Sequence, residues 1–171
     1  STASRVGITL GHVAAGVVGE GLISRLSMGA WRRGMPRAGK PVPEGALGAP
    51  NGDPIVYFPA CGGRICGANS KDEPTLPEVI VELLGRAGYA VRLPEGVDQL
   101  CCGKVMESRG MAEEGDAMAE TAIAALMKAA DDGQGGFYPV VMDASTCSVR
   151  MQKVLAGRLR LLDFHEFAHD A

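Results

Sequence analysis

The chain has 171 residues, 46% of them apolar and 22% charged, and its 17 Lys/Arg against 20 Asp/Glu give a formal net charge of -3. This composition is typical of a globular chain long enough for a proper core. It excludes intrinsic disorder, and the 24 glycines follow no three-residue period that would indicate collagen. Nucleic acid is not expected as a partner, because the chain has no basic surplus.

The charge is unevenly distributed. Residues 1–50 carry six basic against two acidic side chains, whereas the remaining 121 residues carry 11 basic and 18 acidic ones. The chain also begins at Ser1 rather than at a methionine. We therefore expect it to be a piece of a longer polypeptide, in which the basic N-terminal segment lies against something outside this sequence.

The N-terminal third is predicted to be a helical segment followed by a linker. Apolar residues recur at roughly helical spacing from Val6 to about Trp31, although each interior glycine costs about 1 kcal/mol relative to alanine. A helix with so many glycines is more plausible packed closely against a neighbour than standing alone. The stretch 34–54 is rich in glycine and proline and is predicted to be a linker. The predicted division is therefore 1–54, an N-terminal helix with a linker, and 55–171, an α/β body.

The body alternates short β-rich runs with helical periodicity. Alternation of this kind predicts a parallel sheet with crossover helices, a Rossmann-like fold of three layers. Ser145 or Thr146 is well placed to cap the last long helix. The predicted strands are 55–58, 89–93, 138–142 and 159–162, and the predicted helices are 76–86, 112–130 and one that runs through Leu155.

Five cysteines form the main chemical signal of the sequence. A disulfide framework is not expected, because the number is odd and the chain is long enough for a core, but any single cysteine could simply pack as a small hydrophobe. Cys61 follows the first predicted strand, the pair Cys101–Cys102 follows the second, and Cys147 follows the third. Because the carboxyl ends of parallel strands share one edge of a sheet, these four thiols are expected to converge there.

Four soft thiolates select zinc or an iron–sulfur cluster over magnesium or calcium. Adjacent cysteines are awkward for a single zinc ion and suit a multi-iron cluster. Helices that begin nearby, above all the one after Cys147, would offer amide donors and favour thiolate over thiol. Arg64 and Lys104 can offset remaining negative charge, and Cys66 is expected to pack rather than to bind.

Three segments of the sequence resemble the cysteine-rich CCG domain of iron–sulfur oxidoreductases: Tyr57–Cys61, Cys101–Lys104 and Asp143–Cys147. The resemblance covers roughly 55–167, and 76–78, 87–89 and 93–96 are similar to the branch of FAD-linked D-lactate dehydrogenases. The domain also occurs in glycolate oxidase iron–sulfur subunits, anaerobic glycerol-3-phosphate dehydrogenase and heterodisulfide reductase. In the lactate branch an FAD domain oxidises a 2-hydroxy acid, and a C-terminal iron–sulfur region passes the electrons on.

The resemblance implies that this chain is the C-terminal electron-transfer domain of a flavin-linked D-2-hydroxyacid dehydrogenase, and among these enzymes it favours D-lactate dehydrogenase. The chain alone is then not expected to be catalytic. Its cofactor would be a 4Fe–4S cluster, with zinc as a substitute, and FAD would belong to the missing N-terminal portion. The implied ligands are Cys61, Cys101, Cys102 and Cys147. The alternative is a structural or interaction module in which the same thiolates hold zinc.

The resemblance also implies partners and a location. The partners would be the FAD domain and ferredoxin-like region of the same polypeptide, with quinone or a cytochrome as electron acceptor. The location would be the cytoplasm, with the inner face of the membrane as a peripheral alternative. One departure from the family is clear: the pattern often ends in C-x-x-C, but Arg150 stands where the second cysteine would be, which counts against a five-thiolate cluster.

One further motif points elsewhere. His165–His169 matches H-E-x-x-H, the zinc-peptidase signature. We reject that function, because the only other histidine is the distant His12 and the family resemblance already accounts for Asp163 and Glu166–Phe167.

Overall fold

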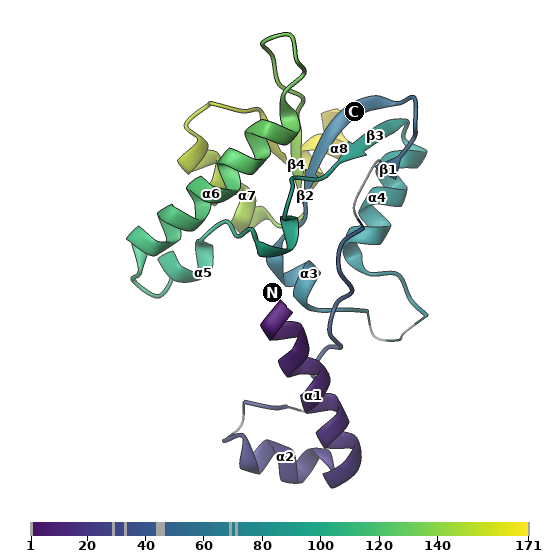
Figure 1. Cartoon of the computed structure of the whole chain (residues 1–171), viewed down its shortest axis with the longest axis vertical. Helices are drawn as coiled ribbons and strands as arrows, with labels where there is room; N and C mark the ends of the chain where they lie inside the picture. Colours follow the sequence, from purple (N-terminus) through teal and green to yellow (C-terminus); the bar gives the residue numbers. More distant parts are fainter. Residues whose placement is uncertain are drawn as a thin grey trace.

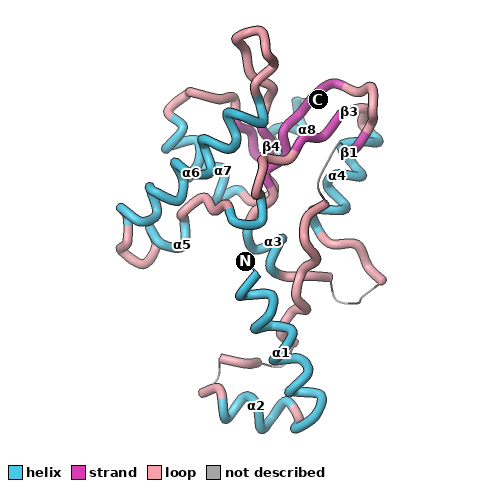
Figure 2. Tube along the Cα trace, viewed as in Figure 1, coloured by secondary structure: helices cyan, strands magenta, loops and turns pink. Residues whose placement is uncertain are grey.

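A five-stranded sheet covered by helices on both faces organises the chain, as the sequence predicts (Figure 1, Figure 2). The computed structural model describes residues 2–28, 30–32, 34–43, 47–68, 70 and 72–170. The strands lie in the order β1-β3-β2-β4-β5, and every pair is parallel except β1 with β3. Their bounds are Leu47–Gly48 (β1), Asp53–Phe58 (β2), Tyr89–Arg92 (β3), Val140–Met142 (β4) and Leu161–Asp163 (β5).

The order of the strands reverses at β2. After β2 the chain builds β3 on one side, and it then returns to build β4 on the other side. In open α/β sheets such a switch point leaves a crevice outside the carboxyl ends of the strands. The segments between the strands are α3 (Cys61–Ile65), α4 (Leu76–Arg86), the 3-10 turn η1 (Val97–Gln99), α5 (Lys104–Glu107), α6 (Ala112–Ala130), α7 (Ser145–Leu155) and, after β5, α8 (Phe164–Asp170).

The central strand β2 shows how the core is divided. Successive side chains of a strand point to opposite faces. Val56 and Phe58 therefore pack in the cluster that contains α6 and α7, whereas Ile55 and Tyr57 pack in the cluster that contains α4 and α8. Because β2 has both faces covered, its sequence is almost continuously apolar, as in other buried parallel strands.

Some predicted boundaries differ from the structure. The predicted linker contains β1, an antiparallel edge strand of two residues that pairs with β3. The helix that runs to Leu155 begins at Ser145 with Ala144 as its N-cap and no side-chain capping bond, so the prediction of Ser145 or Thr146 as the cap is wrong. The last strand lies at Leu161–Asp163, slightly later than predicted.

The N-terminal segment forms two helices, α1 (Thr2–Val18) and α2 (Glu20–Leu26), because Gly19 breaks the predicted continuous helix with a φ of 86°. The indole of Trp31 packs so closely on Gly11 that a Cβ there would collide with the ring. The ring of His12 also meets Trp31 edge-on, with 4.8 Å between centroids. The predicted close packing of a glycine is thus found at Gly11. Through Trp31, the segment after α2 packs against α1.

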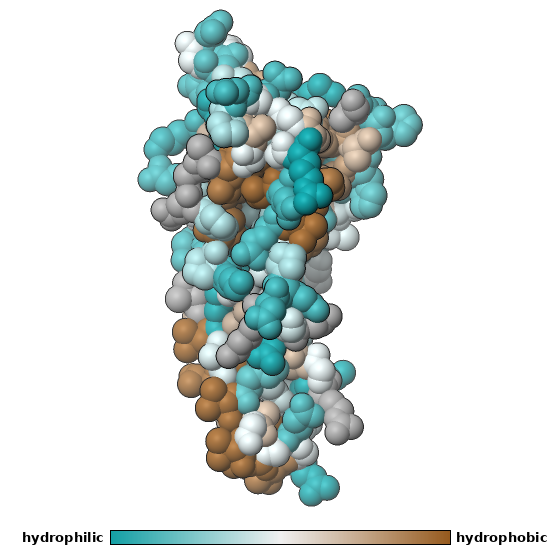
Figure 3. Space-filling model, turned by 90° about the vertical axis from the view of Figure 1, so that its right-hand side faces the viewer, coloured by the Kyte–Doolittle hydropathy of each residue, from teal (hydrophilic) through white to brown (hydrophobic). Residues whose placement is uncertain are grey.

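We call residues 2–43 the N-terminal arm, and it projects below the sheet in Figure 1. A stripe of exposed apolar side chains runs along it, visible as the apolar surface over the lower part of the molecule in Figure 3. Within the described part of the chain, no helix combines the length and the apolar character needed to cross a bilayer. The stripe comprises Val6, Leu10, Val13, Val17, Leu22 and Leu26.

Candidate functional site

Three loops meet at the carboxyl edge of the sheet. β2 ends at Phe58 and leads to Cys61, the first residue of α3. β4 leads into α7, in whose first turn Cys147 lies. The loop after β3 passes through η1 to the pair Cys101–Cys102, just before α5. Since β3 and β4 flank β2, all three loops lie beside the switch point.

The structure brings together the thiols of all four predicted ligands. The Sγ atom of Cys102 donates to the Sγ atom of Cys147 over 3.1 Å. The thiol of Cys101 is hydrogen-bonded to those of both Cys61 and Cys102. All are free cysteines; Cys102 and Cys147 are buried, and the other two are partly buried. A continuous row of sulfur contacts therefore runs Cys61–Cys101–Cys102–Cys147, and we call it the thiol row.

The pKa values alternate along the thiol row. The pKa of Cys101 is lowered, first by its hydrogen bond with Cys102 and next by that with Cys61. The pKa of Cys147 is also lowered, mainly by its hydrogen bond with Cys102. The pKa values of Cys61 and Cys102 are raised, in both cases most strongly by the hydrogen bond with Cys101. Lowered and raised pKa values thus alternate along the thiol row, and a metal-containing group bound by all four sulfurs would release the protons that remain on them.

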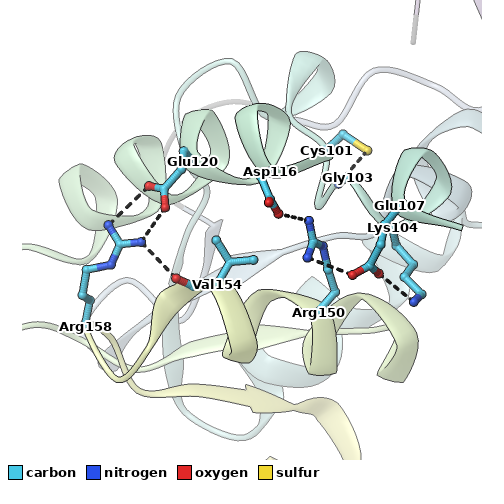
Figure 4. A network of polar contacts seen from close by, with 9 residues as sticks. All are labelled: Cys101, Gly103, Lys104, Glu107, Asp116, Glu120, Arg150, Val154 and Arg158. Carbon is cyan, nitrogen blue, oxygen red and sulfur yellow. Dashed lines mark hydrogen bonds and ion pairs between the residues drawn. The ribbon is translucent and has the colours of Figure 1, made fainter. Parts of the chain in front are cut away.

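Backbone amides at the start of α5 point toward the thiol row. The amide of Gly103 donates to the Sγ atom of Cys101 over 3.4 Å (Figure 4), and the amide of Lys104 donates to Cys102. Gly103 makes this turn with a φ of 75°, in the left-handed region that favours glycine. A Cβ at Gly103 would also collide with the backbone of Gly115 on α6. This position therefore requires glycine both for its backbone conformation and for its close approach to α6.

Arg64 lies beside the thiol row and is almost fully buried, with 1% of its surface exposed. Burial lowers the pKa of its guanidinium, while the neighbouring Cys61, Asp98 and Cys101 raise it. The same guanidinium contributes to the lowered pKa of Cys101. The charge compensation that the sequence suggests for Arg64 is therefore present in the structure.

Asp143 braces the loops on the other side of the row. Its Oδ1 atom accepts the amide of Ala60 over 2.7 Å, and its Oδ2 atom accepts the hydroxyl of Tyr57 over 2.6 Å. Burial, and next the charge of Asp143, raise the pKa of the Tyr57 phenol, which therefore stays a neutral donor. This pair links the end of β2 to the loop after β4.

The residues at positions 104 and 150 belong to a separate network of ion pairs (Figure 4). The guanidinium of Arg150 is bound by Asp116 and, over 3.0 Å, by Glu107, which also accepts Lys104 over 2.8 Å. The side chain of Arg150 therefore ties α7 to α5 and α6 instead of joining the thiol row. Lys104 is likewise paired with a carboxylate, so compensation of the thiolates falls to Arg64 rather than to both residues.

The sulfurs of the thiol row lie closer together than the ligands of a single zinc ion or of a multi-iron cluster, whose corners are farther apart still. Among the described residues, no three His, Cys, Asp or Glu side chains are arranged to hold one metal ion. Two sulfurs on one tetrahedral zinc lie about 3.8 Å apart, given a Zn–S bond of about 2.3 Å. The Sγ atoms of Cys102 and Cys147 are closer than this, at 3.1 Å. The donor set itself, four thiols from three loops, fits a metal–sulfur centre after these sulfurs separate.

The remaining candidates lie away from the thiol row. Cys66 takes part in an isolated β-bridge with Ala38 of the arm. His165 and His169 are largely exposed on α8, and each ring is paired with the nearby carboxylate of Asp163 or Asp170.

Sequence reasoning missed two features of the site: the brace of Tyr57 and Asp143, and the burial of Arg64. The sequence signal for the brace is a polar residue within or just after an otherwise apolar strand, whereas Arg64 lies within α3 and has no such signal.

Comparison with known proteins identifies a family. A family model for the CCG cysteine-rich domain matches residues 55–152, which is more than half of the chain. No curated protein sequence and no solved structure matches the chain. The matched span begins in β2 and ends in α7, so it contains the whole thiol row. The chain belongs to the CCG cysteine-rich domain family.

Proposed function

We propose that this CCG domain is an iron–sulfur electron-transfer module of an oxidoreductase. The observation that carries the proposal is the thiol row: four cysteines from three loops in continuous contact at the switch point of the sheet. Cys61, Cys101, Cys102 and Cys147 would hold the cluster. A 4Fe–4S cluster supplies uptake and release of single electrons when it is bound.

The residues of this chain supply what such a centre needs from a protein. The amides of Gly103 and Lys104 donate to sulfur, and hydrogen bonds to the sulfurs are one of the factors that set a reduction potential. Cys102 and Cys147 are no more than 9% exposed, so water is largely excluded on that side. Cys61 and Cys101 are more accessible and mark the side through which electrons would enter or leave.

The proposal extends to the parent enzyme. We infer a flavin-linked D-2-hydroxyacid dehydrogenase of the D-lactate dehydrogenase type, in which this module accepts electrons from the FAD domain or the ferredoxin-like region of the same polypeptide. A quinone or a cytochrome would receive them, in the cytoplasm or at the inner face of the membrane. What supports this part is family membership and the resemblance of the segments around 76–96 to the lactate branch.

Metal content after anaerobic reconstitution tests the module. The wild-type chain should turn brown and contain iron and acid-labile sulfide. Cys101→Ser and Cys102→Ser should each lose most of both, while Cys66→Ser, the matched control outside the thiol row, should retain them. Stoichiometric zinc without iron in the wild type would instead identify a structural zinc module, and equal metal retention in all three variants would refute the ligand assignment.

The parent activity is tested in the longer polypeptide. D-lactate should reduce its flavin equally well in the wild type and in Cys101→Ser. Transfer of electrons from the reduced flavin to a quinone analogue or to cytochrome c should occur in the wild type and fail in Cys101→Ser. Failure of D-lactate to reduce the wild-type flavin would refute the dehydrogenase and leave the electron-transfer module standing.

A further inference from the structure

A buried arginine links two of the three loops that form the site. Arg64 is among the largest side chains that are fully buried. Burying a guanidinium is costly unless its donors find acceptors. Its Nε atom donates to the carbonyl of Pro59 over 2.9 Å, Nη1 donates to the carbonyl of Val97, and Nη2 donates to the carbonyl of Leu100 over 2.5 Å.

Two of these acceptors lie just before cysteines of the thiol row. Pro59 is two residues before Cys61, and Leu100 directly precedes Cys101. One planar side chain therefore fixes the loop after β2 against the loop after β3. A lysine could not replace it, because an ammonium is a point charge on a flexible stem and lacks the rigid fork of the guanidinium.

The backbone of Arg64 is held in turn by the N-terminal arm. The Nε and Nη2 atoms of Arg5 donate to the carbonyl of Arg64 over 3.1 and 2.9 Å. The guanidinium of Arg5 also binds the carboxylate of Asp98 in η1 through two hydrogen bonds of 2.7 and 3.0 Å. Arg5 is 9% exposed, so this contact between α1, α3 and η1 is itself mostly buried.

The charge of Arg64 acts on two sulfurs of the thiol row. The groups that act on its guanidinium are Cys61, Asp98 and Cys101, which favour the cation, and Arg5, which opposes it. Asp98 is already bound by Arg5 through two hydrogen bonds. Besides Asp98, the positive charge of Arg64 therefore acts on Cys61 and Cys101, the two more accessible thiols of the row.

We propose that Arg64 is the positioning residue of the thiol site: its fork sets the separation of the Cys61 and Cys101 loops, and its fixed charge favours the more negative, reduced state of a group bound there. The first part concerns the metal-free chain as well, and the second rests on the proposed function. Two variants separate the two parts. Arg64→Lys keeps the charge and loses the fork, so only the positioning should fail. Arg64→Met loses both, so the positioning and the effect of the charge should both fail.

Disulfide trapping in the metal-free chain tests the positioning. Diamide takes two electrons and two protons from a pair of thiols in contact, and mass spectrometry then counts each disulfide. Formation of the Cys61–Cys101 disulfide should be at least fivefold slower in both Arg64 variants. The Cys102–Cys147 disulfide, which does not span the Arg64 contacts, should form at the wild-type rate and serves as an internal control.

The reduction potential of the reconstituted protein tests the charge. Arg64→Met should have a lower potential than the wild type, and Arg64→Lys should stay close to the wild type. Arg150→Met is the matched control, because Arg150 is as deeply buried but already paired with Glu107 and Asp116, and its potential should not change. Circular dichroism identifies any variant that does not fold, and Arg64→Lys carries the test if Arg64→Met fails.

Wild-type trapping rates in both Arg64 variants, together with an unchanged potential in Arg64→Met, would overturn the proposal. A wild-type chain that takes up no iron and sulfide would refute the proposed function instead, and the trapping rates would still decide whether Arg64 positions the loops.

Discussion

Arg150 stands where a further cysteine of the pattern would be, and its side chain connects helices instead of joining the thiol row. At this position the guanidinium extends to Glu107 and Asp116, and 4% of the side chain is exposed. Both carboxylates are more exposed than the arginine, so they can regain water if the pair is broken. The position that a C-x-x-C ending would give to a second cysteine therefore serves packing between α5, α6 and α7 in this chain.

Asp163 gives a pH dependence of stability at the end of β5. Burial opposes its ionised form, but hydrogen bonds from the backbone and ring of His165 and from the hydroxyl of Ser148 outweigh this and lower its pKa to about 2. A carboxyl group with a depressed folded-state pKa stabilises the fold above its ordinary pKa of about 4 and loses this contribution as the pH falls toward 2.

Asp163→Asn should therefore lower the free energy of unfolding at pH 7, and its difference from the wild type should shrink between pH 4 and pH 2. Urea unfolding of both proteins at several pH values measures this difference. A difference that stays constant down to pH 2.5 would show that ionisation of Asp163 contributes nothing to stability.

At the scale of elements, the turn into α5 depends on glycine for two separable reasons. Gly103 has a φ of 75° and lies against the backbone of Gly115. Gly110 has a similar φ of 81°, but a Cβ there would meet no atom within 4 Å. A left-handed conformation alone costs an L-residue roughly 1–2 kcal/mol.

Gly110→Ala should thus lower the free energy of unfolding by about 1 kcal/mol, and Gly103→Ala by more, since α5 must also move away from α6. Gly103→Ala should in addition reduce iron and sulfide uptake, because the amides of Gly103 and Lys104 shift away from Cys101 and Cys102. Chemical denaturation and metal analysis of both variants provide the comparison. Equal destabilisation would mean that contact with Gly115 contributes nothing.

The elements that the sequence predicts well are those in which apolar residues recur at helical spacing over many residues. The helices Leu76–Arg86 and Ala112–Ala130 agree with the prediction at both ends, because burial of an amphipathic face and local preference act together. The short elements α3, α5 and β1 were not predicted. α3 has five residues and two glycines, and β1 has two residues, so tertiary contacts rather than local periodicity determine them.

At the scale of the whole molecule, the position of the thiols followed from topology. Parallel strands place their carboxyl ends at one edge, so cysteines after three strands could be expected to meet without any knowledge of side chains. The Arg64 fork could not be predicted in this way, because its acceptors are carbonyls of Pro59, Val97 and Leu100, whose orientation depends on the folded loops. The arm contact is equally remote in sequence: Arg5 and Asp98 are 93 residues apart.

The N-terminal arm, residues 2–43, is expected to differ from the rest of the chain in local stability. The arm exposes much of its apolar surface, and α2 has no buried residue. It is joined to the body through Arg5, through a bridge of Ala38 with Cys66, and through the amide of Gly39, which donates to the carbonyl of Ile65 over 2.7 Å. Segments with few buried contacts open at lower free energy than a sheet core, so amides of α1 and α2 should exchange faster than those of β2.

Arg5→Met should increase the difference in amide exchange between the N-terminal arm and the rest of the chain. Charge-assisted hydrogen bonds contribute about 1.5–3 kcal/mol each on removal, so amide exchange in α1 should accelerate roughly tenfold or more, while exchange in β2 and α6 stays unchanged. Arg25→Met, which replaces an exposed arginine of α2, is the control and should leave all regions unaffected. Hydrogen–deuterium exchange with peptide resolution measures this. Equal acceleration in the arm and in β2 would show that the chain opens as one cooperative unit and that the arm is no separate part.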